Sequence, residues 1–396
     1  MERDYVVIRS RQPVRRDVTR GGFTFGPAVE EEAGVEGVDI EQPTLDDTER
    51  FDVARDPQVR ALAAAMPMKL IEPVADEAVE PAAGASWGVE AVKAPQSPFD
   101  GSGVTVAVLD TGIDPTHPAF AAVADRIEQR NFTTEGDDDS HGHGTHCAGT
   151  IFGQDVAGQR IGVARGVERA LIGKVLGEGG GSSATVAEAI QWAVNGGAHV
   201  VSMSLGIDFP GYVEYLVERG DMDIVAATSI ALAEYRHNIN LFNAVAELVR
   251  SQASFTQGTV IVAASGNESS RPAYSVAVAP PAAGVGIVAI GALGQSAGGL
   301  TVAPFSNAEV DVSAPGVNIV SAGLGGGLRA MSGTSMATPH AAGLAALWAE
   351  RMIGTAGTVM PSGLVAQLVA MADTSSLADG FTSYDVGSGV AQAPLA

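Results

Sequence analysis

Cysteine, basic residues and uninterrupted apolar runs are all scarce in this 396-residue sequence. The one cysteine, Cys147, excludes an intrachain disulfide, and this count does not fix the redox compartment. Lysine and arginine total 23 against 46 acidic residues, and the net charge of −23 argues against nucleic acid and anionic membranes as partners. The longest apolar stretch, 275–292, contains two prolines and three glycines, which favours strands and a turn over a membrane span.

A secretory signal peptide is also missing from the start of the sequence, since residues 1–5 carry charges with no apolar segment behind them. We therefore expect a cytoplasmic protein, with secretion by another route as the alternative. The hydrophobic content of 46% is high enough for a sizeable core. The length accommodates one large domain and a small one.

The first 85 residues differ in texture from the rest. Residues 5–8 and 68–71 predict short strands, and a helix is predicted from Asp56, because Val59, Leu62 and Ala63 then share a face. The intervening stretches are charged and aperiodic, which predicts loop over 9–26 and 30–56.

Residues 73–86 are rich in alanine, glutamate and proline, a composition that predicts a linker. We therefore place a boundary there, between an N-terminal region (1–85) and a larger domain (86–396).

Beyond residue 86, apolar strand-like runs alternate with helix-like runs. The run 104–109 is continuous and β-branched, which is typical of a strand buried on both faces of a parallel sheet. The alternation predicts an α/β fold with a mostly parallel sheet. Strands are expected at 104–109, 170–176, 199–205, 259–264 and 286–291, and helices at 146–151, 184–196 and 239–252.

Polar residues follow several of these strands. Asp110, Ser204 and the run 265–267 lie at or just past predicted strand ends. Because ligand-binding groups gather at the carboxyl ends of parallel strands, we expect these side chains to share one site.

Asp110, His143 and Ser335 are the side-chain types of a nucleophilic triad. Ser335 precedes an apolar helix-like run, and a helix N-terminus favours developing negative charge. A serine needs an adjacent base, which histidine supplies near neutral pH, and a buried carboxylate orients that histidine. Taken singly, Asp110 and Ser335 are also good helix caps, and the histidines of 141–146 could bind a metal.

Three motifs together resemble the subtilisin-like serine peptidases (subtilases, peptidase family S8). Residues 108–114 (VLDTGID), 143–150 (HGTHCAGT) and 333–340 (GTSMATPH) match the family's aspartate, histidine and serine motifs in order. The resemblance covers about residues 87–395. It implies a three-layer α/β fold with a mostly parallel central sheet and helices on both faces, plus a small N-terminal propeptide-like segment.

The resemblance also implies roles. Ser335 would be the nucleophile, His143 the general base and then acid, and Asp110 its orienting partner. Asn267 matches the oxyanion-hole asparagine, although by itself it would be a turn residue after glycine. His146 and His340 would be structural.

The substrate cleft follows from the same resemblance. Two small, apolar walls would form the first specificity pocket and favour an apolar residue before the cut (P1), with Glu268 at the rim. A glycine run would pair with an extended substrate, although it is also compatible with a flexible loop. The walls are Ser204, Leu205 and Gly206, and Ala264, Ser265 and Gly266; the glycine run is Gly179, Gly180 and Gly181.

Several features depart from the family pattern or extend it. An insertion at about 207–237 is expected to form a lid or flank that narrows substrate access. Residues 1–85 are expected to be a propeptide that inhibits by filling the cleft and is removed near 73–86, with a permanent adaptor as the alternative. Structural calcium is possible at 137–139 or 154–159, although a charge run is more often a solvated face.

Two further positions carry expectations. Pro281 matches a position that follows a cis peptide bond in the family, and Cys147 is expected to be a buried free thiol near the site.

The sequence therefore predicts a serine endopeptidase that works through an acyl-enzyme, with polypeptide substrates and no cofactor for its chemistry. Its own N-terminal segment is expected as an intramolecular inhibitor, and neither nucleic acid nor membrane as a partner. A peptide macrocyclase or other acyl transferase on the same scaffold, and a catalytically silent binding protein, are the alternatives.

Overall fold

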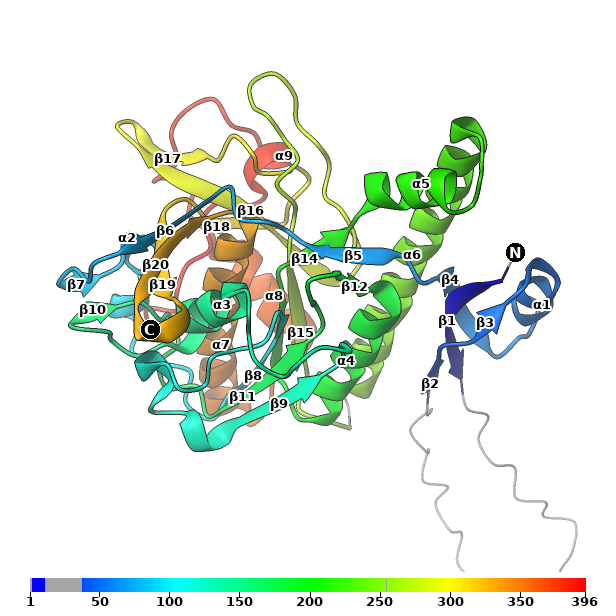
Figure 1. The fold of residues 1–396 in the computed structure, drawn as a ribbon. Coiled ribbons are helices and arrows are strands. Elements are labelled where there is room, and N and C mark those ends of the chain that lie inside the picture. The colour runs from blue at the N-terminus through cyan, green and yellow to red at the C-terminus, as the bar shows by residue number, and fades with distance from the viewer. Residues whose placement is uncertain (1, 11–37, 254) are drawn as a thin grey trace, which may run out of the picture.

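A computed structural model describes residues 2–10, 38–253 and 255–396 (Figure 1). The loop predicted over 9–26 lies almost entirely outside these residues. An eight-stranded central sheet has the strand order β17-β16-β15-β13-β8-β11-β9, with β18 also paired to β16. Every pairing in it is parallel except that of β16 with β17. The strands are β8 (Thr105–Asp110), β9 (Ile127–Asn131), β11 (Arg169–Lys174), β13 (Val200–Met203), β15 (Val260–Ala264), β16 (Ile287–Ser296), β17 (Gly299–Val302) and β18 (Val312–Pro315).

Helices cover both faces of this sheet, so the predicted three-layer α/β fold is confirmed. The strand β8 shows why: Val106 and Val108 point into one apolar core and Ala107 and Leu109 into the other, as the two-residue period of a strand requires. The first core contains α3 (His143–Phe152), α7 (Thr334–Ala356) and α8 (Pro361–Ala370); the second contains α4 (Ser183–Asn195), α5 (Phe209–Glu218) and α6 (Ile224–Gln252). Two short helices, α2 (Trp87–Ala91) and α9 (Ser383–Val386), complete the domain.

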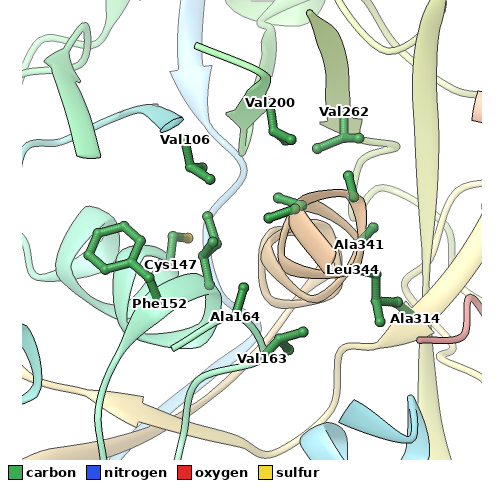
Figure 2. Close-up of a cluster of buried hydrophobic side chains, with 14 of the residues drawn as sticks. Val106, Cys147, Phe152, Val163, Ala164, Val200, Val262, Ala314, Ala341 and Leu344 are labelled. Carbon is green, nitrogen blue, oxygen red and sulfur yellow. The ribbon is translucent and has the colours of Figure 1, made fainter. Parts of the chain in front are cut away.

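The helix α7 is buried along its first sixteen residues, 334–349. Figure 2 shows Ala341 and Leu344 of α7 among Val200, Val262 and Ala314 of the sheet, with Cys147 of α3 close by. A helix that is apolar all round belongs in a core, which explains the alanine-rich run after Ser335.

The N-terminal unit is a small antiparallel sheet with one helix. Its strands are β1 (Arg3–Ser10), β2 (Val38–Glu41), β3 (Thr44–Leu45) and β4 (Val59–Ala64), and its helix is α1 (Asp47–Val53). The helix predicted from Asp56 is wrong, because β4 occupies that stretch and pairs with β1. Short apolar runs fit both periodicities, and here Ala61 and Ala63 are buried on one face of a strand.

The loop predicted over 30–56 is also wrong in its described part, which holds β2, β3 and α1. A capping box starts α1: Asp46 accepts hydrogen bonds from the backbone of Thr48 and Glu49, while the Glu49 side chain accepts one from Asp46 N. The pattern, an aspartate followed three residues later by a glutamate, is visible in the sequence as a possible capping box.

The N-terminal unit packs on the outer face of α4 and α6 (Figure 1). Val6, Ile8 and Ala63 share an apolar core with Ala187 of α4 and Leu241 of α6. Polar contacts reinforce this core, since Glu234 of α6 accepts a hydrogen bond from Ala64 N (3.3 Å) and Asn238 donates one to Ala64 O (2.9 Å).

The chain then crosses the larger domain as a series of paired strands. β5 (Pro67–Leu70) lies between β12 (Gly181–Ser182) and β14 (Leu205–Ile207), antiparallel to both. β6 (Ala75–Val79) pairs with β20 (Leu328–Ser332), which also pairs with β19 (Ile319–Ala322), and β7 (Gly84–Ala85) pairs with β10 (Gln159–Arg160). The linker predicted over 73–86 thus contains β6 and β7, whose backbone pairing does not depend on an apolar composition.

The expected insertion consists of α5 and the first half of α6. The helix predicted over 239–252 begins at Ile224 instead, so α6 runs for 29 residues. Among the helices of the described residues, none is long and apolar enough to cross a lipid bilayer.

The packing of α7 predicts a large effect of truncation at its centre. Leu344→Ala removes a fully buried side chain and should lower the free energy of unfolding by about 2–5 kcal/mol. Leu232→Ala, on the exposed side of α6 with 54% of the residue accessible, should change it by less than about 0.5 kcal/mol. Urea unfolding followed by tryptophan fluorescence measures both, and equal losses would contradict the assignment of α7 to the core.

Candidate active site

The predicted site residues meet at the carboxyl edge of the sheet. Asp110 ends β8, Ser204 follows β13 and Asn267 follows β15, while His143 and Ser335 stand in the first turns of α3 and α7. The helices α3 and α7 lie side by side against one face of the sheet, so residues far apart in the sequence converge.

Asp110 and His143 form a buried pair. The His143 Nδ1 donates to Asp110 Oδ1 at 2.8 Å, and Thr111 N donates to the same oxygen at 2.8 Å. Burial by itself lowers the pKa of His143, but the Asp110 carboxylate and, after it, Cys147 outweigh burial and hold that pKa well above its usual value of 6.5. The other ring nitrogen, Nε2, has no hydrogen-bond partner among the described residues. It is therefore available to exchange a proton.

The buried carboxylate of Asp139 ties together the segments that carry this pair. Its Oδ1 accepts from Thr111 Oγ1 (2.9 Å) and Gly142 N (2.8 Å), and its Oδ2 accepts from Thr145 N (3.0 Å) and Thr145 Oγ1 (2.6 Å). Burial raises the pKa of Asp139, but these donors lower it further than burial raises it, so the net pKa lies below the ordinary value. One anion thus fixes both the aspartate loop and the start of α3.

The backbone carbonyl of Ser335 makes contacts that an ordinary helix would not permit. Pro339 lacks the N–H that would bond to this carbonyl four residues earlier. Ser204 Oγ donates to it instead at 3.1 Å, and Cys147 Sγ lies 3.4 Å away. Cys147 Sγ is also 3.8 Å from His143 Nδ1, so this buried free thiol, as expected, links the two helices at the site.

Asn267 lies beside Ser335 through Thr334. Its Oδ1 accepts from Thr334 N and from Thr334 Oγ1, both at 2.9 Å, which turns its Nδ2 toward the cleft. That Nδ2 donates to Glu72 O at 2.9 Å, and Ser335 Oγ donates to Ile71 O at 2.9 Å. The protein's own chain therefore lies across both groups.

The predicted pocket walls stand on either side of this crossing. Leu205 and Gly206 belong to β14, and a Cβ on Gly206 would lie 3.6 Å from the Ile71 side chain. Opposite, Ala264 ends β15, and Ser265 and Gly266 follow it. Gly266 has φ +114°, and a Cβ there would meet the Asn307 amide at 2.3 Å, so this wall requires glycine. Glu268 at the rim accepts from Asn307 Nδ2 at 2.8 Å.

The predicted glycine edge is occupied. Gly181 pairs with Met68 in β12, and a Cβ on Gly180, whose φ is +80°, would lie 2.6 Å from Met68 O. Gly179 has open space around it. Two of the three glycines expected to bind an extended peptide, Gly180 and Gly181, thus lie against Met68 of this chain.

The two other buried histidines of the motifs bond to backbone carbonyls. His146 Nε2 donates to Ile319 O (2.9 Å), and His340 Nδ1 donates to Met336 O (2.8 Å). Burial, with repulsion from His143, lowers the pKa of His146 to about 3, and burial lowers that of His340 to about 4. Both are neutral at physiological pH, which fits the structural role predicted for them.

The geometry does not bring the histidines of 141–146 together as metal ligands. Within the described part of the chain, one group of His, Cys, Asp and Glu brings its ligand atoms within 4.8 Å, and it consists of Asp110, His143 and Cys147. His141 and His146 are not in it. The Pro280–Pro281 bond is cis, as the motif comparison predicts for Pro281.

Several side-chain oxygens of the two loops considered for calcium accept hydrogen bonds or ion pairs from protein donors. Asp155 pairs with Arg165 at 2.8 Å, Gln159 Oε1 accepts from Ala82 N at 2.8 Å, and Asp137 accepts from Asn131 at 3.1 Å. Asp139, as described above, uses both oxygens on Thr111 and on the start of α3.

Motif reasoning missed several residues of the site. Asp139 stood in an acidic run that composition alone assigns to solvent, and its position four residues before His143 was the available signal. The resemblance predicted that the N-terminal region fills the cleft, but Ile71 and Glu72 were missed because nothing in their sequence marks them as the residues that reach Ser335 and Asn267.

Comparisons with known proteins agree on one family. The sequence profile of the subtilase family (peptidase S8) matches residues 101–383. Subtilisin Savinase of Lederbergia lenta is 35% identical over 267 residues, 66% of this chain and 82% of that protein. M-protease of Shouchella clausii (strain KSM-K16) is 35% identical over 267 residues, 66% of this chain and 58% of that protein. Subtilisin-like protease 1 of Trichophyton rubrum is 33% identical over 321 residues, 76% of this chain and 53% of that protein.

The buried pair predicts an unusual titration. The His143 imidazole should be half protonated well above pH 6.5, so its proton-accepting neutral form prevails only on the alkaline side. Asp110→Asn removes the anion but leaves the burial, and should move the midpoint below 6.5. Imidazole NMR signals across a pH series measure both. Asp137→Asn, which removes an exposed carboxylate, is the matched control, and a midpoint at or below 6.5 in the unaltered protein would contradict the pairing.

Proposed function

Because the chain belongs to the subtilase family, we propose that it is a serine endopeptidase that cleaves peptide bonds through an acyl-enzyme. The observation that carries this proposal is the bound strand β5, an extended peptide held between β12 and β14 and followed at once by a carbonyl at the Ser335 hydroxyl. Pairing on both edges of a strand is how an extended substrate would be held. The chain spans 58% of the length of M-protease, so this activity is proposed for the protein rather than read from that relative.

The proposed reaction uses the three side chains in sequence. Ser335 Oγ attacks the substrate carbonyl carbon while His143 Nε2, free of other hydrogen bonds among the described residues, takes its proton. Asp110 stabilises the resulting imidazolium through the 2.8 Å hydrogen bond. His143 then protonates the leaving amine, which leaves the acyl group on Ser335. Water attacks this ester while His143 takes its proton, and His143 returns the proton to Ser335 Oγ as the acid is released.

Two donors are proposed to stabilise the oxyanion. Asn267 Nδ2 is aimed at the crossing chain by its Thr334 contacts, and Ser335 N lies at the start of α7, where the helix dipole favours negative charge. Here Asn267 Nδ2 bonds to Glu72 O and the Ser335 hydroxyl to Ile71 O. For attack at Ile71, the Ser335 hydroxyl must turn to His143 and the Ile71 carbonyl toward Asn267.

An apolar P1 residue fits the pocket. The antiparallel register sets Leu70 opposite Leu205 and Lys69 opposite Gly206, so Ile71 is the residue that follows the paired stretch and reaches the nucleophile. Its side chain lies beside Gly206. We therefore propose cleavage after Ile71 and a preference for apolar P1 residues.

The N-terminal region is proposed to act as an inhibitory propeptide. Its antiparallel sheet packs against α4 and α6. The chain then runs through the cleft as β5, where it excludes other peptides. The boundary near residue 85 stays a prediction, and the cut proposed here lies a few residues before the stretch 73–86 in which the sequence placed it. A permanent adaptor is the competing interpretation.

Structural calcium, a cytoplasmic location and acyl transfer stay predictions. Structural calcium at 137–139 or 154–159 stays a proposal from the family resemblance, and at the oxygens named above it would compete with protein donors. A cytoplasmic location rests on sequence alone. Acyl transfer to an amine instead of water uses the same site, and no observation in the structure favours it.

Replacement of the nucleophile tests the function directly. The unaltered chain should react with a fluorophosphonate probe at Ser335 and lose residues 1–71, whereas Ser335→Ala should do neither, because it lacks the attacking hydroxyl. Ser102→Ala, at an exposed serine far from the site, should behave like the unaltered protein. Intact-mass spectrometry reads both results.

Each other outcome has a meaning. Labelling without loss of residues 1–71 favours the adaptor, and a product joined to an added amine favours acyl transfer. Failure of the probe to label any protein overturns the proposed function.

The oxyanion assignment predicts a rate effect. Asn267→Ala should lower kcat about 10²–10³-fold on a peptide substrate with little change in KM, because the lost donor acts mainly on the transition state. Asn195→Ala, at an exposed helix end, should leave both constants unchanged. Steady-state kinetics separates the two constants, and a purely KM-based effect would argue that Asn267 only binds substrate.

A further inference from the structure

The side chains of β5, the strand in the cleft, point alternately toward the protein and toward solvent. Met68 and Leu70 of β5 are buried, whereas Pro67 and Lys69 are partly exposed. A peptide that replaces this strand in the same register would present its own third residue before the cut, P3, where Lys69 now lies. This step rests on the function proposed above.

Asp208, the residue between β14 and α5, faces that position. Its carboxylate lies 3.1 Å from the Lys69 ammonium, with 29% of the Asp208 side chain and 43% of the Lys69 side chain exposed. The backbone explains the contact: Asp208 N donates to Pro67 O at 3.0 Å, so Lys69 is two residues along on the same face, within reach of a diagonal cross-strand pair.

The Asp208 carboxylate is held in place independently of Lys69. It caps the N-terminus of α5 by accepting from Gly211 N at 3.2 Å. Its position is therefore set by the helix and by the strand register. A P3 side chain in a bound peptide meets a fixed anion.

A second acidic group lies near Lys69. A hollow of about 270 Å³ next to β5 is lined by Lys69, Glu72 and Glu178. Glu72 lies after the proposed cut and is 3.7 Å from His141, so Glu178 is the acid of this hollow that stays in place when another peptide binds. The net charge of −23 acts in the same direction. A basic side chain at this position is thus attracted, mainly by Asp208, and an acidic one is repelled.

We propose that Asp208, which begins the inserted segment, makes this enzyme prefer lysine or arginine at P3 of its peptide substrates. The recognised substrates are extended basic–apolar sequences, with apolar residues at P4, P2 and P1 and a positive charge at P3. The insertion thereby acts as a specificity element through the residue that caps its first helix.

Peptides that copy residues 66–72 with lysine, glutamine or glutamate at the third position before the cut test this. After maturation and titration of active sites with the fluorophosphonate probe, kcat/KM should favour lysine over glutamine about three- to fivefold and over glutamate about tenfold at low salt. The preference should fade in 1 M salt, where the screening length is about 3 Å.

Asp208→Asn keeps a good helix cap but removes the charge, and should abolish the preference while the glutamine peptide is cleaved as before. Asp223→Asn makes the same change at the cap of α6, away from β5, and should retain it. Equal rates for the three peptides, or a preference that survives Asp208→Asn, would overturn the inference. Absence of both probe labelling and turnover would instead count against the proposed function.

A second measurement needs no turnover. In a Ser335→Ala background, thermal unfolding of Lys69→Gln, Asp208→Asn and the double variant gives the coupling between the two side chains. The double variant should be destabilised by less than the sum of the single ones, and the difference should shrink in 1 M salt. Strictly additive losses of stability would contradict a favourable interaction between Lys69 and Asp208.

Discussion

A negative charge buried at the end of β8 is the constraint on which the site depends. An unpaired Asp110 carboxylate in that position would be costly, and the imidazole of His143 provides the compensating donor. The partnership requires α3 to begin at one place relative to the sheet. A second buried anion, Asp139, secures that placement by binding both the loop after β8 and the first turn of α3. The position of the catalytic pair therefore depends on a carboxylate, Asp139, that lies outside the three motifs.

The serine side of the site is fixed by an irregularity in a helix. Pro339 deprives the carbonyl of Ser335 of its helical donor, and Ser204 and Cys147 take over that role. The wall of the substrate pocket, the helix of the histidine and the helix of the serine thus meet at one oxygen atom. A substitution of Ser204, Cys147 or Pro339 is therefore expected to shift the other groups that meet at this oxygen.

Sequence reasoning recovered the larger domain because its signals are local. The run 104–109 had to be buried on both faces, and the motifs around Asp110, His143 and Ser335 each span a single strand end or helix start. The N-terminal unit was harder, because β4 is short and its alanines fit either periodicity, and the capping box at Asp46 was overlooked. The strand predicted over 68–71 is present as β5, but the pairing of residues 75–79 could not be predicted: β6 has mostly exposed side chains and is held by backbone hydrogen bonds to β20. Such pairing leaves no trace in composition.

That same backbone pairing limits what a cut after Ile71 could release. Only Glu72, Pro73 and Val74 would separate the fresh amino end from β6, and Val74 N already donates to Ser332 O at 2.7 Å, close to the nucleophile. A tether of three residues reaches about 10 Å when extended. The newly formed amine would consequently stay on the leaving-group side of the catalytic serine, where it competes with the downstream half of any incoming peptide. Turnover would then require either that β6 separate from β20 or that each substrate displace residues 72–74 from the leaving-group side.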